Sequence, residues 1–464
     1  MPDLSRIVKA YDIRGLVPDE LDVEVAGALG AAAVHVLGDR VSRGRASAIV
    51  VGHDMRESSV PLSEAFADGV TAQGADVVMI GLASTDQLYF ASGHLDLPGA
   101  MFTASHNPAA YNGIKLCRAG ASPLAADTGL ERLRELAEGP RLPVAPEPGA
   151  ISRRDLLAEY AAHLHALVDL SGARPLTVVV DAGNGMAGHT VPAVLEGLPF
   201  TVVPLYFELD GTFPHHEANP LDPATLVDLQ ARVRETGADL GLAFDGDADR
   251  CFVVDERGEP VSPSALTALI AVRELARHPG STVIHNLITS RVVPEVVRVH
   301  GGTPVRTRVG HSFVKQAMAE SGAVFGGEHS GHFYFRDFWR ADSGMLAALH
   351  TLAALSAEPP GTRLSELVGV YNRYASSGEV NLRVADTAAA LAGVRTAWAG
   401  GEGVRMDDLD GLTVGNDGWW FNVRPSNTEP LLRLNVEAGD PGTMARLRDE
   451  VVAVVTASQT GRTG

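Results

Sequence analysis

The sequence is poor in cysteine and in basic charge, and it has no long apolar run. Its only cysteines, Cys117 and Cys251, exclude a disulfide framework and favour a reducing compartment. Lysine and arginine number 38 against 57 acidic residues, and this net charge of −19 argues against a general nucleic-acid-binding surface. No apolar stretch is long enough to span a bilayer, and residues 1–6 show no signal core. We therefore expect a cytoplasmic protein that binds neither nucleic acid nor membrane.

The length and the alternation of patterns predict several α/β domains. A chain of 464 residues is too long for one core. Apolar strands are expected at 48–51 and 76–80, with a helix from about Ser58 or Ser59 between them, which implies a parallel sheet. The Pro/Gly-rich stretch 138–149 is typical of a linker, and a helix is expected from Ser152 to about Leu170. The expected domains are 1–150, 151–256, 257–370 and 371–464, and the last of them mixes strands with one terminal helix.

One polar stretch, residues 103–115, has the features of a reactive loop. It follows the apolar run 99–102 and contains the turn-forming pairs Asn107-Pro108 and Asn112-Gly113, so Ser105 is expected in a tight turn at the end of a strand. Open α/β sheets bind their ligands at that edge. His106 and Lys115 are the candidates for a proton relay and a positive charge beside the Ser105 hydroxyl. Taken alone, the stretch is also compatible with an ordinary polar turn.

The segment 181–188 matches the spacing of a dinucleotide-binding loop, with Gly183, Gly185 and Gly188 after a strand and before a helix. The pattern alone is a weak signal, and the acidic partners that follow, Glu208 and Asp210, come late. We interpret it as a tight strand-to-helix turn.

An acidic loop follows the expected strand 239–244. Asp245, Asp247 and Asp249 are carboxylates at alternate positions, and they would repel each other unless a cation neutralised them. Three hard oxygen ligands favour Mg²⁺. An EF-hand is the weaker alternative, because Arg250 occupies the position of its required glycine and the flanks are expected strands; a solvated acidic turn is the other.

Two further loops combine polar groups. The glycine-rich segment 326–332 carries Glu328, Ser330, His329 and His332, a set suited to gripping sugar hydroxyls, with metal binding through the two histidines as the rival interpretation. The expected phosphate cradle lies between strands near the C-terminus and consists of Arg424, Ser426, Asn427 and Thr428. Near the N-terminus, Arg14 precedes a glycine and could present a guanidinium in a loop.

Together these loops divide the work of phosphoryl transfer on a sugar. The segments 103–108, 245–250, 327–332 and 424–430 resemble, in order, the four signatures of the α-D-phosphohexomutases, and residues 11–15 and 310–311 match as well. The forms of the last two signatures are similar to the phosphomannomutase/phosphoglucomutase branch. The resemblance runs from about Tyr11 to Pro430 and implies four domains around a central cleft, three α/β with mixed sheets and a C-terminal TBP-like α+β domain.

The resemblance also implies roles for individual residues. Ser105 would be a phosphoserine whose phosphate oxygen, with Asp245, Asp247 and Asp249, holds Mg²⁺. Arg14, Lys115 and Arg250 would surround the transferring phosphoryl group. The candidates for proton transfer are Lys115, His311 and His332. Residues implied to bind the phosphosugar substrate are Tyr11, Glu328, Ser330, Arg424, Ser426, Asn427 and Thr428.

The implied reaction interconverts hexose 1-phosphate and hexose 6-phosphate of mannose, glucose or both, through a hexose 1,6-bisphosphate that also acts as activator. The alternatives are a phosphoglucosamine mutase, a metal-dependent sugar phosphatase and a non-catalytic sugar-phosphate sensor. One departure from the pattern is Leu287-Ile288, where some relatives carry a basic residue that contacts substrate.

Overall fold

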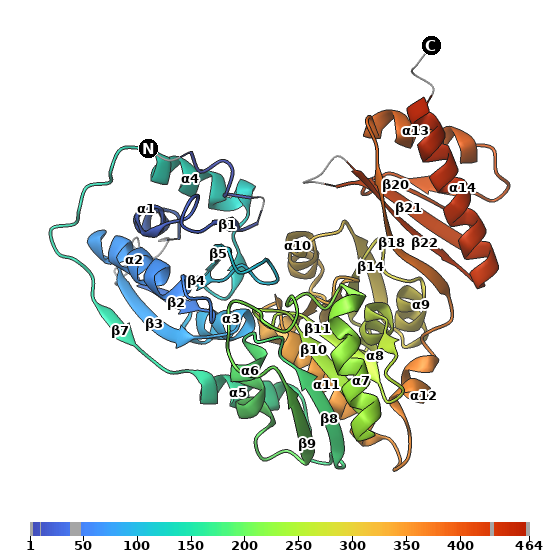
Figure 1. Ribbon diagram of the computed structural model, residues 1–464, viewed down its shortest axis with the longest axis horizontal. Coiled ribbons are helices and arrows are strands. Elements are labelled where there is room, and N and C mark those ends of the chain that lie inside the picture. The colour runs from blue at the N-terminus through green and yellow to red at the C-terminus, as the bar shows by residue number, and fades with distance from the viewer. Residues whose placement is uncertain (1–2, 10, 38–47, 427–430, 461–464) are drawn as a thin grey trace.

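The computed structural model describes residues 3–9, 11–37, 48–426 and 431–460, which fold into four domains in chain order (Figure 1). Each domain is built on one sheet, and the sheets of the first three mix parallel and antiparallel strands. The strands of the fourth sheet are all antiparallel. The predicted fold class, three α/β domains followed by an α+β domain, is confirmed.

The sheet of the first domain has the order β1-β5-β4-β2-β3-β7, with β6 paired to β5. Val50, Val51 and their neighbours in β2 are buried on both faces, because helices cover the two sides of this parallel segment. The strands are β1 (Ile13–Leu16), β2 (Ala48–His53), β3 (Asp76–Leu82), β4 (Gly99–Phe102), β5 (Tyr111–Arg118), β6 (Ser122–Pro123) and β7 (Ile151–Arg153). The helices are α1 (Val23–Leu37), α2 (Ser59–Ala72), α3 (Thr85–Leu95) and α4 (Glu131–Glu138).

Residues 151–153 differ from the expectation of a helix that begins at Ser152. They form β7, which pairs in parallel with β3 and so extends the first sheet. The reason is tertiary, since the open edge of β3 offers unpaired backbone groups that β7 satisfies. The helix α5 begins only at Leu157, whose N–H donates to Asp155 Oδ1 at 2.9 Å.

The second and third domains each contain a five-stranded sheet, in the orders β12-β11-β10-β8-β9 and β14-β13-β15-β16-β17. The second comprises β8 (Leu176–Asp181), β9 (Phe200–Leu205), β10 (Leu240–Phe244), β11 (Cys251–Asp255) and β12 (Pro260–Val261), with α5 (Leu157–Leu167), α6 (Ala187–Leu195) and α7 (Val227–Thr236). The third comprises β13 (Thr282–Asn286), β14 (Thr303–Thr307), β15 (Phe325–Gly327), β16 (Phe333–Phe335) and β17 (Ala341–Asp342), with α8 (Pro263–Arg277), α9 (Val292–Val299), α10 (His311–Ser321), α11 (Gly344–Ala357) and α12 (Leu364–Gly369).

The fourth domain has the sheet order β18-β22-β21-β20-β19, with two helices packed on it. Its elements are β18 (Ala375–Arg383), α13 (Thr387–Trp398), β19 (Arg405–Asp407), β20 (Leu412–Gly415), β21 (Trp419–Pro425), β22 (Leu431–Ala438) and α14 (Pro441–Thr460).

The apolar core is not shared equally among the domains. One continuous cluster runs through the first three, from Val50 and Met101 through Val180 and Phe244 to Phe325. The fourth domain has a separate cluster that includes Val394, Phe421 and Val451. The first three domains therefore form one packed unit, on which the fourth stands at the end opposite α1 and α2 (Figure 1).

Polar contacts join the fourth domain to the third. The guanidinium of Arg291 donates to the carbonyl oxygens of Asp417 at 2.5 Å and Asn416 at 3.0 Å. The backbone N–H of Arg291 donates to Glu437 Oε1 at 3.1 Å. Asp410 Oδ2 accepts from Val309 N at 3.1 Å. These contacts hold the fourth domain without merging the two cores.

Candidate active site

The Ser105 loop connects β4 to β5 at the carboxyl end of β4, as the sequence predicts. Ser105 has a φ of +51°, in the left-handed region that residues other than glycine seldom adopt. Its side chain is almost fully buried, and its Oγ donates to Asp245 Oδ2 at 2.7 Å. The backbone N–H of Ser105 donates to Thr103 Oγ1 at 2.9 Å. Contacts around the loop therefore hold the hydroxyl against the second domain.

The acidic loop connects the antiparallel strands β10 and β11 of the second domain. Asp245, Asp247 and Asp249 are all buried in it. Gly246 allows the close approach of the two loops, because a Cβ at this position would lie only 2.4 Å from the carbonyl oxygen of Ser105. The flanks are strands, so the EF-hand alternative is wrong.

Two cations lie against the carboxylates. Lys115 Nζ is 2.6 Å from Oδ2 of both Asp247 and Asp249. Burial works against its charge, but these two carboxylates outweigh burial and raise the pKa of Lys115 above its usual value. Arg250 Nε donates to Asp245 Oδ2 at 2.9 Å. Both side chains are thus held as cations beside Ser105.

Arg14 reaches the same loop from β1. The pairing of β1 with β5 sets Arg14 opposite Gly113. Its Nη1 donates to Asn107 Oδ1 at 2.5 Å, and its Nε donates to Asp12 Oδ2 at 2.7 Å. The side chain is 22% exposed, so part of the guanidinium faces solvent beside the Ser105 loop.

The donor set of the acidic loop fits a divalent metal. One ligand oxygen from each of Asp245, Asp247 and Asp249 lies within 4.8 Å of the others. The buried Oδ1 atoms of Asp247 and Asp249 have no hydrogen-bond partner among the described residues. Burial raises the pKa of Asp245 to about 7 despite Arg250, because Asp249 and Asp247 also disfavour a third negative charge. A hard cation would satisfy these oxygens and remove the repulsion.

His106 does not have the environment of a proton relay. Its Nδ1 lies 3.2 Å from Ser105 Oγ but also 2.6 Å from Arg250 Nη2, which donates to it. Burial lowers the pKa of His106 to about 2, and Arg250 and Arg14 add to the effect. The imidazole is therefore neutral in this arrangement, which differs from the sequence-based expectation of a relay through it.

The third domain contributes the segment 326–332. Glu328 is buried, and its Oε2 accepts from Tyr334 Oη at 2.6 Å while its Oε1 accepts from Gly310 N at 3.1 Å. Asn286 Nδ2 donates to the same Oε1 at 3.2 Å. These bonds fix the carboxylate. The neighbouring Ile288 is buried and apolar, so it supplies no charge here.

His332 is oriented by a carboxylate and a lysine. Its Nδ1 lies 3.0 Å from Asp342 Oδ2 and 3.9 Å from Asp249 Oδ1, and Lys315 Nζ lies 2.8 Å from Asp342 Oδ1. Burial opposes protonation of His332, but Asp249 and Asp342 outweigh it and raise its pKa. The main chain of His332 also forms a bridge with that of Arg250, which joins the segment 326–332 to the acidic loop.

His311 is the first residue of α10, and its ring lies 4.9 Å from that of Tyr11 in an edge contact. The N-cap residue of this helix is Gly310. Burial, followed by the charge of Lys315, lowers the pKa of His311 to about 4. His311 is therefore neutral near pH 7, in contrast to Lys115. Tyr11 thus makes one of the contacts between the first and third domains.

The predicted phosphate cradle lies in the fourth domain. Arg424 is buried, its Nη2 donates to Glu379 Oε2 at 2.7 Å, and its Nε has no hydrogen-bond partner among the described residues. The N–H of Ser426 donates to Leu431 O at 2.9 Å. Asn427 and Thr428 lie outside the described residues. The structure thus joins the loops of the first three domains directly, while the contacts of Arg424 named here lie within the fourth.

Sequence analysis missed Thr85, Lys315 and Asp342. Thr85 Oγ1 donates to Asp247 Oδ2 at 2.6 Å, and its only sequence signal is a position just after the expected strand 76–80. Lys315 follows His311 by four residues and so lies on the same helix face, which could have indicated it. Asp342 has no comparable signal, since the folding of β17 beside β16 brings it to His332.

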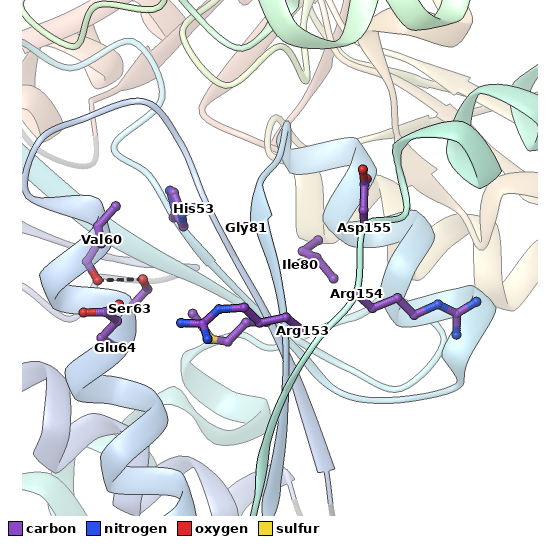
Figure 2. Close-up of a pocket in the computed structure, with 10 residues that line it drawn as sticks. His53, Val60, Ser63, Glu64, Ile80, Gly81, Arg153, Arg154 and Asp155 are labelled. Carbon is purple, nitrogen blue, oxygen red and sulfur yellow. Dashed lines mark hydrogen bonds between the residues drawn. The ribbon is translucent and has the colours of Figure 1, made fainter.

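A hollow of about 280 Å³ lies elsewhere on the first domain, where β2, β3 and β7 end (Figure 2). His53, Glu64 and Arg153 are among its lining residues, and Arg154 points away from them. None of the predicted site residues lines this hollow, so it is separate from the loops described above.

Four family models of one set match most of the chain, in order. Their descriptions are phosphoglucomutase/phosphomannomutase alpha/beta/alpha domain I over residues 5–139, domain II over 158–258, domain III over 262–374, and the C-terminal domain over 379–454.

Full-length relatives agree with these matches. Phosphohexose mutases of Xanthomonas campestris pv. campestris are 42% identical over 449 residues, which cover 96% of this chain and 98% of that protein. A phosphomannomutase of Salmonella montevideo is 40% identical over 457 residues, again covering 96% and 98%. The crystal structure of a phosphoglucomutase/phosphomannomutase family protein from Burkholderia thailandensis has a TM-score of 0.88 at 33% identity and covers 99% of both chains.

The four-domain fold and these relatives define an intramolecular phosphotransferase that acts on hexose phosphates. The chain belongs to the phosphoglucomutase/phosphomannomutase family. Such enzymes are generally metal-dependent, and the acidic triad is the candidate metal site. In the described part of the chain, no helix is both long and apolar enough to cross a membrane.

Proposed function

We propose that this chain interconverts the 1- and 6-phosphates of mannose and glucose through a phosphoserine at Ser105 and a hexose 1,6-bisphosphate. The observation that carries the proposal is the environment of Ser105 Oγ. The hydroxyl donates to Asp245 at 2.7 Å, three buried carboxylates gather within 4.8 Å of one another, and Lys115 and Arg250 lie against them. A hydroxyl, a cation site and fixed positive charges are the parts that phosphoryl transfer needs.

In the first half-reaction the phosphoryl group leaves Ser105 Oγ for the free hydroxyl of the bound sugar phosphate. The Oγ–P bond breaks, a bond forms between phosphorus and the sugar oxygen, and the hydroxyl proton passes to a protein base. Arg14, Lys115 and Arg250 offset the charge on the phosphoryl oxygens as they become more negative. Of the three candidates for proton transfer, Lys115 is held as a cation and would give a proton to the departing Ser105 Oγ, so His311 and His332 are the candidates for accepting the hydroxyl proton.

The residues that would hold Mg²⁺ are Asp245, Asp247, Asp249 and Ser105, the last through its phosphate oxygen. When bound, the ion supplies positive charge that neutralises the carboxylates and the transferring phosphoryl group. Thr85 fixes one carboxylate of this set through its hydroxyl, which donates to Asp247 Oδ2.

In the second half-reaction the bisphosphate returns its other phosphate to Ser105. The intermediate must turn over within the site, so the non-reacting phosphate needs an anchor that serves both orientations. Arg424 and Ser426, with Asn427 and Thr428, are proposed as that anchor, and the buried Nε of Arg424, which has no hydrogen-bond partner among the described residues, supports it. Added hexose 1,6-bisphosphate would activate the enzyme by phosphorylating Ser105 where it is unmodified.

The reorientation of the bisphosphate within the site also affects sugar specificity. Hydroxyls O3 and O4 exchange approximate places on rotation, so Glu328 and Ser330 can read both orientations. O2 moves to a different place, so the same residues cannot bind it in both orientations. Glucose and mannose phosphates, which differ at C2, are therefore both proposed substrates.

The test is a coupled assay of the purified protein with Mg²⁺ and catalytic glucose 1,6-bisphosphate. Mannose 1-phosphate, glucose 1-phosphate and glucosamine 1-phosphate are offered separately, and the 6-phosphates and free phosphate are measured. Turnover of the first two sugars supports the proposal. Preference for glucosamine phosphate, net release of phosphate, or no conversion would instead indicate a phosphoglucosamine mutase, a phosphatase or a sensor.

The Ser105→Ala variant tests the phosphoserine. We expect it to lose mutase turnover by roughly 10³-fold or more, because the phosphate acceptor is gone. Ser122→Ala, in the exposed strand β6 of the same domain, should keep the wild-type rate. Near-normal turnover by Ser105→Ala would refute the assignment of Ser105.

A further inference from the structure

Arg56 contacts the Ser105 loop with both terminal nitrogens of its guanidinium. Its Nη2 donates to the carbonyl oxygens of Ser105 at 2.9 Å and Asn107 at 2.7 Å. Its Nη1 donates to the carbonyl oxygens of Pro108 and Tyr111, both at 3.0 Å. Four carbonyl groups of one loop thus converge on a single side chain, which is 1% exposed.

Arg56 is itself fixed from behind. Its Nε donates to Asp54 Oδ2 at 3.2 Å, and its backbone N–H donates to Asp54 Oδ1 at 3.0 Å. Ser59 Oγ donates to the same Oδ1 at 2.6 Å, and the N–H of Asp54 donates to Phe102 O at 2.9 Å. Asp54 and Arg56 follow directly after β2, whose last residue, His53, is labelled in Figure 2. The guanidinium therefore has a rigid base at the carboxyl end of the first sheet.

The second domain closes over Arg56 from the other side. The Phe213 ring lies 5.1 Å from the centre of the guanidinium, a cation–π contact. A Cβ at Gly211 would lie 2.7 Å from Arg56 Cα, so the chain passes close to it. Arg56 thus joins the Ser105 loop to the domain that carries the acidic loop.

The conformation of Ser105 requires such a support. A non-glycine residue at φ +51° is strained, and it persists only where its surroundings determine it. The Ser105 carbonyl oxygen accepts from Arg56 Nη2 and also lies close to Gly246. A Cβ at Gly246 would be only 2.4 Å from that oxygen. A small rotation of that peptide would move Oγ away from Asp245.

We propose that Arg56 is a positioning residue for phosphoryl transfer, which holds Ser105 Oγ in line with the acidic loop through the loop carbonyls. The proposal rests on the proposed function of Ser105. The role is geometric and not electrostatic, because Asp54 neutralises the guanidinium charge within the same buried pair. Lysine keeps the charge but has one donor atom on a flexible stem, so it cannot bond four carbonyl oxygens in two directions.

The experiment compares Arg56→Lys with Arg118→Lys. Arg118 lies in the same domain and also donates to carbonyl oxygens, those of Val36 at 2.9 Å and Thr128 at 2.7 Å, so its variant controls for lost packing. Wild type and both variants are assayed for kcat, KM and thermal midpoint. The rate at which Ser105 gains phosphate from glucose 1,6-bisphosphate in a single turnover is followed by intact mass.

For Arg56→Lys we expect kcat and the phosphorylation rate to fall together by about 30-fold or more, with KM within about twofold of wild type, because displacement of the acceptor by a fraction of an ångström is enough. Arg118→Lys should lower the thermal midpoint but leave kcat within about twofold. Equal kcat for Arg56→Lys and wild type would overturn the proposal, and so would parallel losses in the two lysine variants.

Two further measurements keep the proposal testable. If Arg56→Lys does not fold, Phe213→Leu is the second variant, because it keeps the arginine and removes only its ring contact. We expect its phosphorylation rate to be about threefold lower than that of wild type, at unchanged KM. An unchanged phosphorylation rate would count against the proposal. A crystal structure of a folded variant should show Ser105 out of the left-handed region. An inactive wild type would instead remove the proposed function, which separates the two failures.

Discussion

Asp86 brings three hydroxyl groups together on one buried carboxylate. Its Oδ2 accepts from Tyr160 Oη of the second domain at 2.7 Å and from Ser343 Oγ of the third at 2.6 Å, while Ser84 Oγ donates to Oδ1. Burial raises the pKa of Asp86 to about 6, although these hydroxyl donors act in the opposite direction. The first three domains therefore meet at a group whose charge changes in a mildly acidic range.

This carboxyl group predicts a pH dependence of stability. The folded pKa lies above the unfolded value of 3.8, so the folded state holds a proton that the unfolded state releases between about pH 4 and pH 6. As the pH rises across that window, the free energy of unfolding of the wild type should fall by about 3 kcal/mol relative to that of Asp86→Asn. Above about pH 6 the difference between the two proteins should be constant. Urea titrations at pH 4, 5, 6 and 7 measure it.

The control is Asp228→Asn, which removes an exposed carboxylate that also accepts from a tyrosine, Tyr206 Oη at 2.7 Å. It accounts for the loss of a hydroxyl–carboxylate bond alone. A constant difference between wild type and Asp86→Asn from pH 4 to pH 7 would show that Asp86 is charged throughout, and would contradict the expectation.

At the scale of elements, the contact of the Ser105 loop with the acidic loop depends on Gly246, which has no side chain. In Gly246→Ala the new Cβ would lie 2.4 Å from the Ser105 carbonyl oxygen, so the loops must separate. We expect kcat to fall by roughly 10²-fold, because the acceptor hydroxyl and the metal ligands no longer fit together. The coupled assay measures it, with thermal melting to show that the variant folds.

Gly172→Ala is the matched control in the second domain, because a Cβ there meets no atom within 4 Å. It should behave as wild type. An active Gly246→Ala protein would mean that the two loops tolerate a wider separation than the structure has.

The acidic loop also predicts how the enzyme responds to metal removal. Chelation with EDTA should abolish turnover, since three buried carboxylates would be left without the cation that neutralises them. Added Mg²⁺ should restore the rate. Asp249→Asn should require a higher Mg²⁺ concentration for half-maximal activity. Full activity after exhaustive chelation, with metal content checked by mass spectrometry, would rule out this role for the triad.

The sequence predicts these loops because each follows an apolar run that ends at turn residues, as at Phe102 and Phe244. What it does not predict depends on partners distant in the chain. The strand β7 has three exposed residues with no apolar pattern, so only the free edge of β3 makes it a strand. Thr85 lies 162 residues from Asp247, and Arg56 lies 49 from Ser105, so their roles appear only in the folded chain.

At the scale of the whole molecule, the fourth domain has its own core and should unfold separately. Three of the four tryptophans, Trp398, Trp419 and Trp420, lie in it. We expect tryptophan fluorescence to report a urea midpoint below that of the far-UV circular dichroism of the whole chain, since polar contacts alone would not couple the two cores. Coincident transitions by the two probes would show one cooperative unit instead.

The position of β7 has a consequence for protein engineering. The strand belongs to the first sheet but follows the linker 138–149, and the first three domains share one apolar cluster. A protease cut within the linker would leave β7 on the C-terminal fragment, still paired with β3 of the N-terminal fragment. The nicked enzyme should migrate as a single particle in native conditions and separate only in denaturant. The linker is thus a natural place to split the gene for reassembly of two co-expressed fragments.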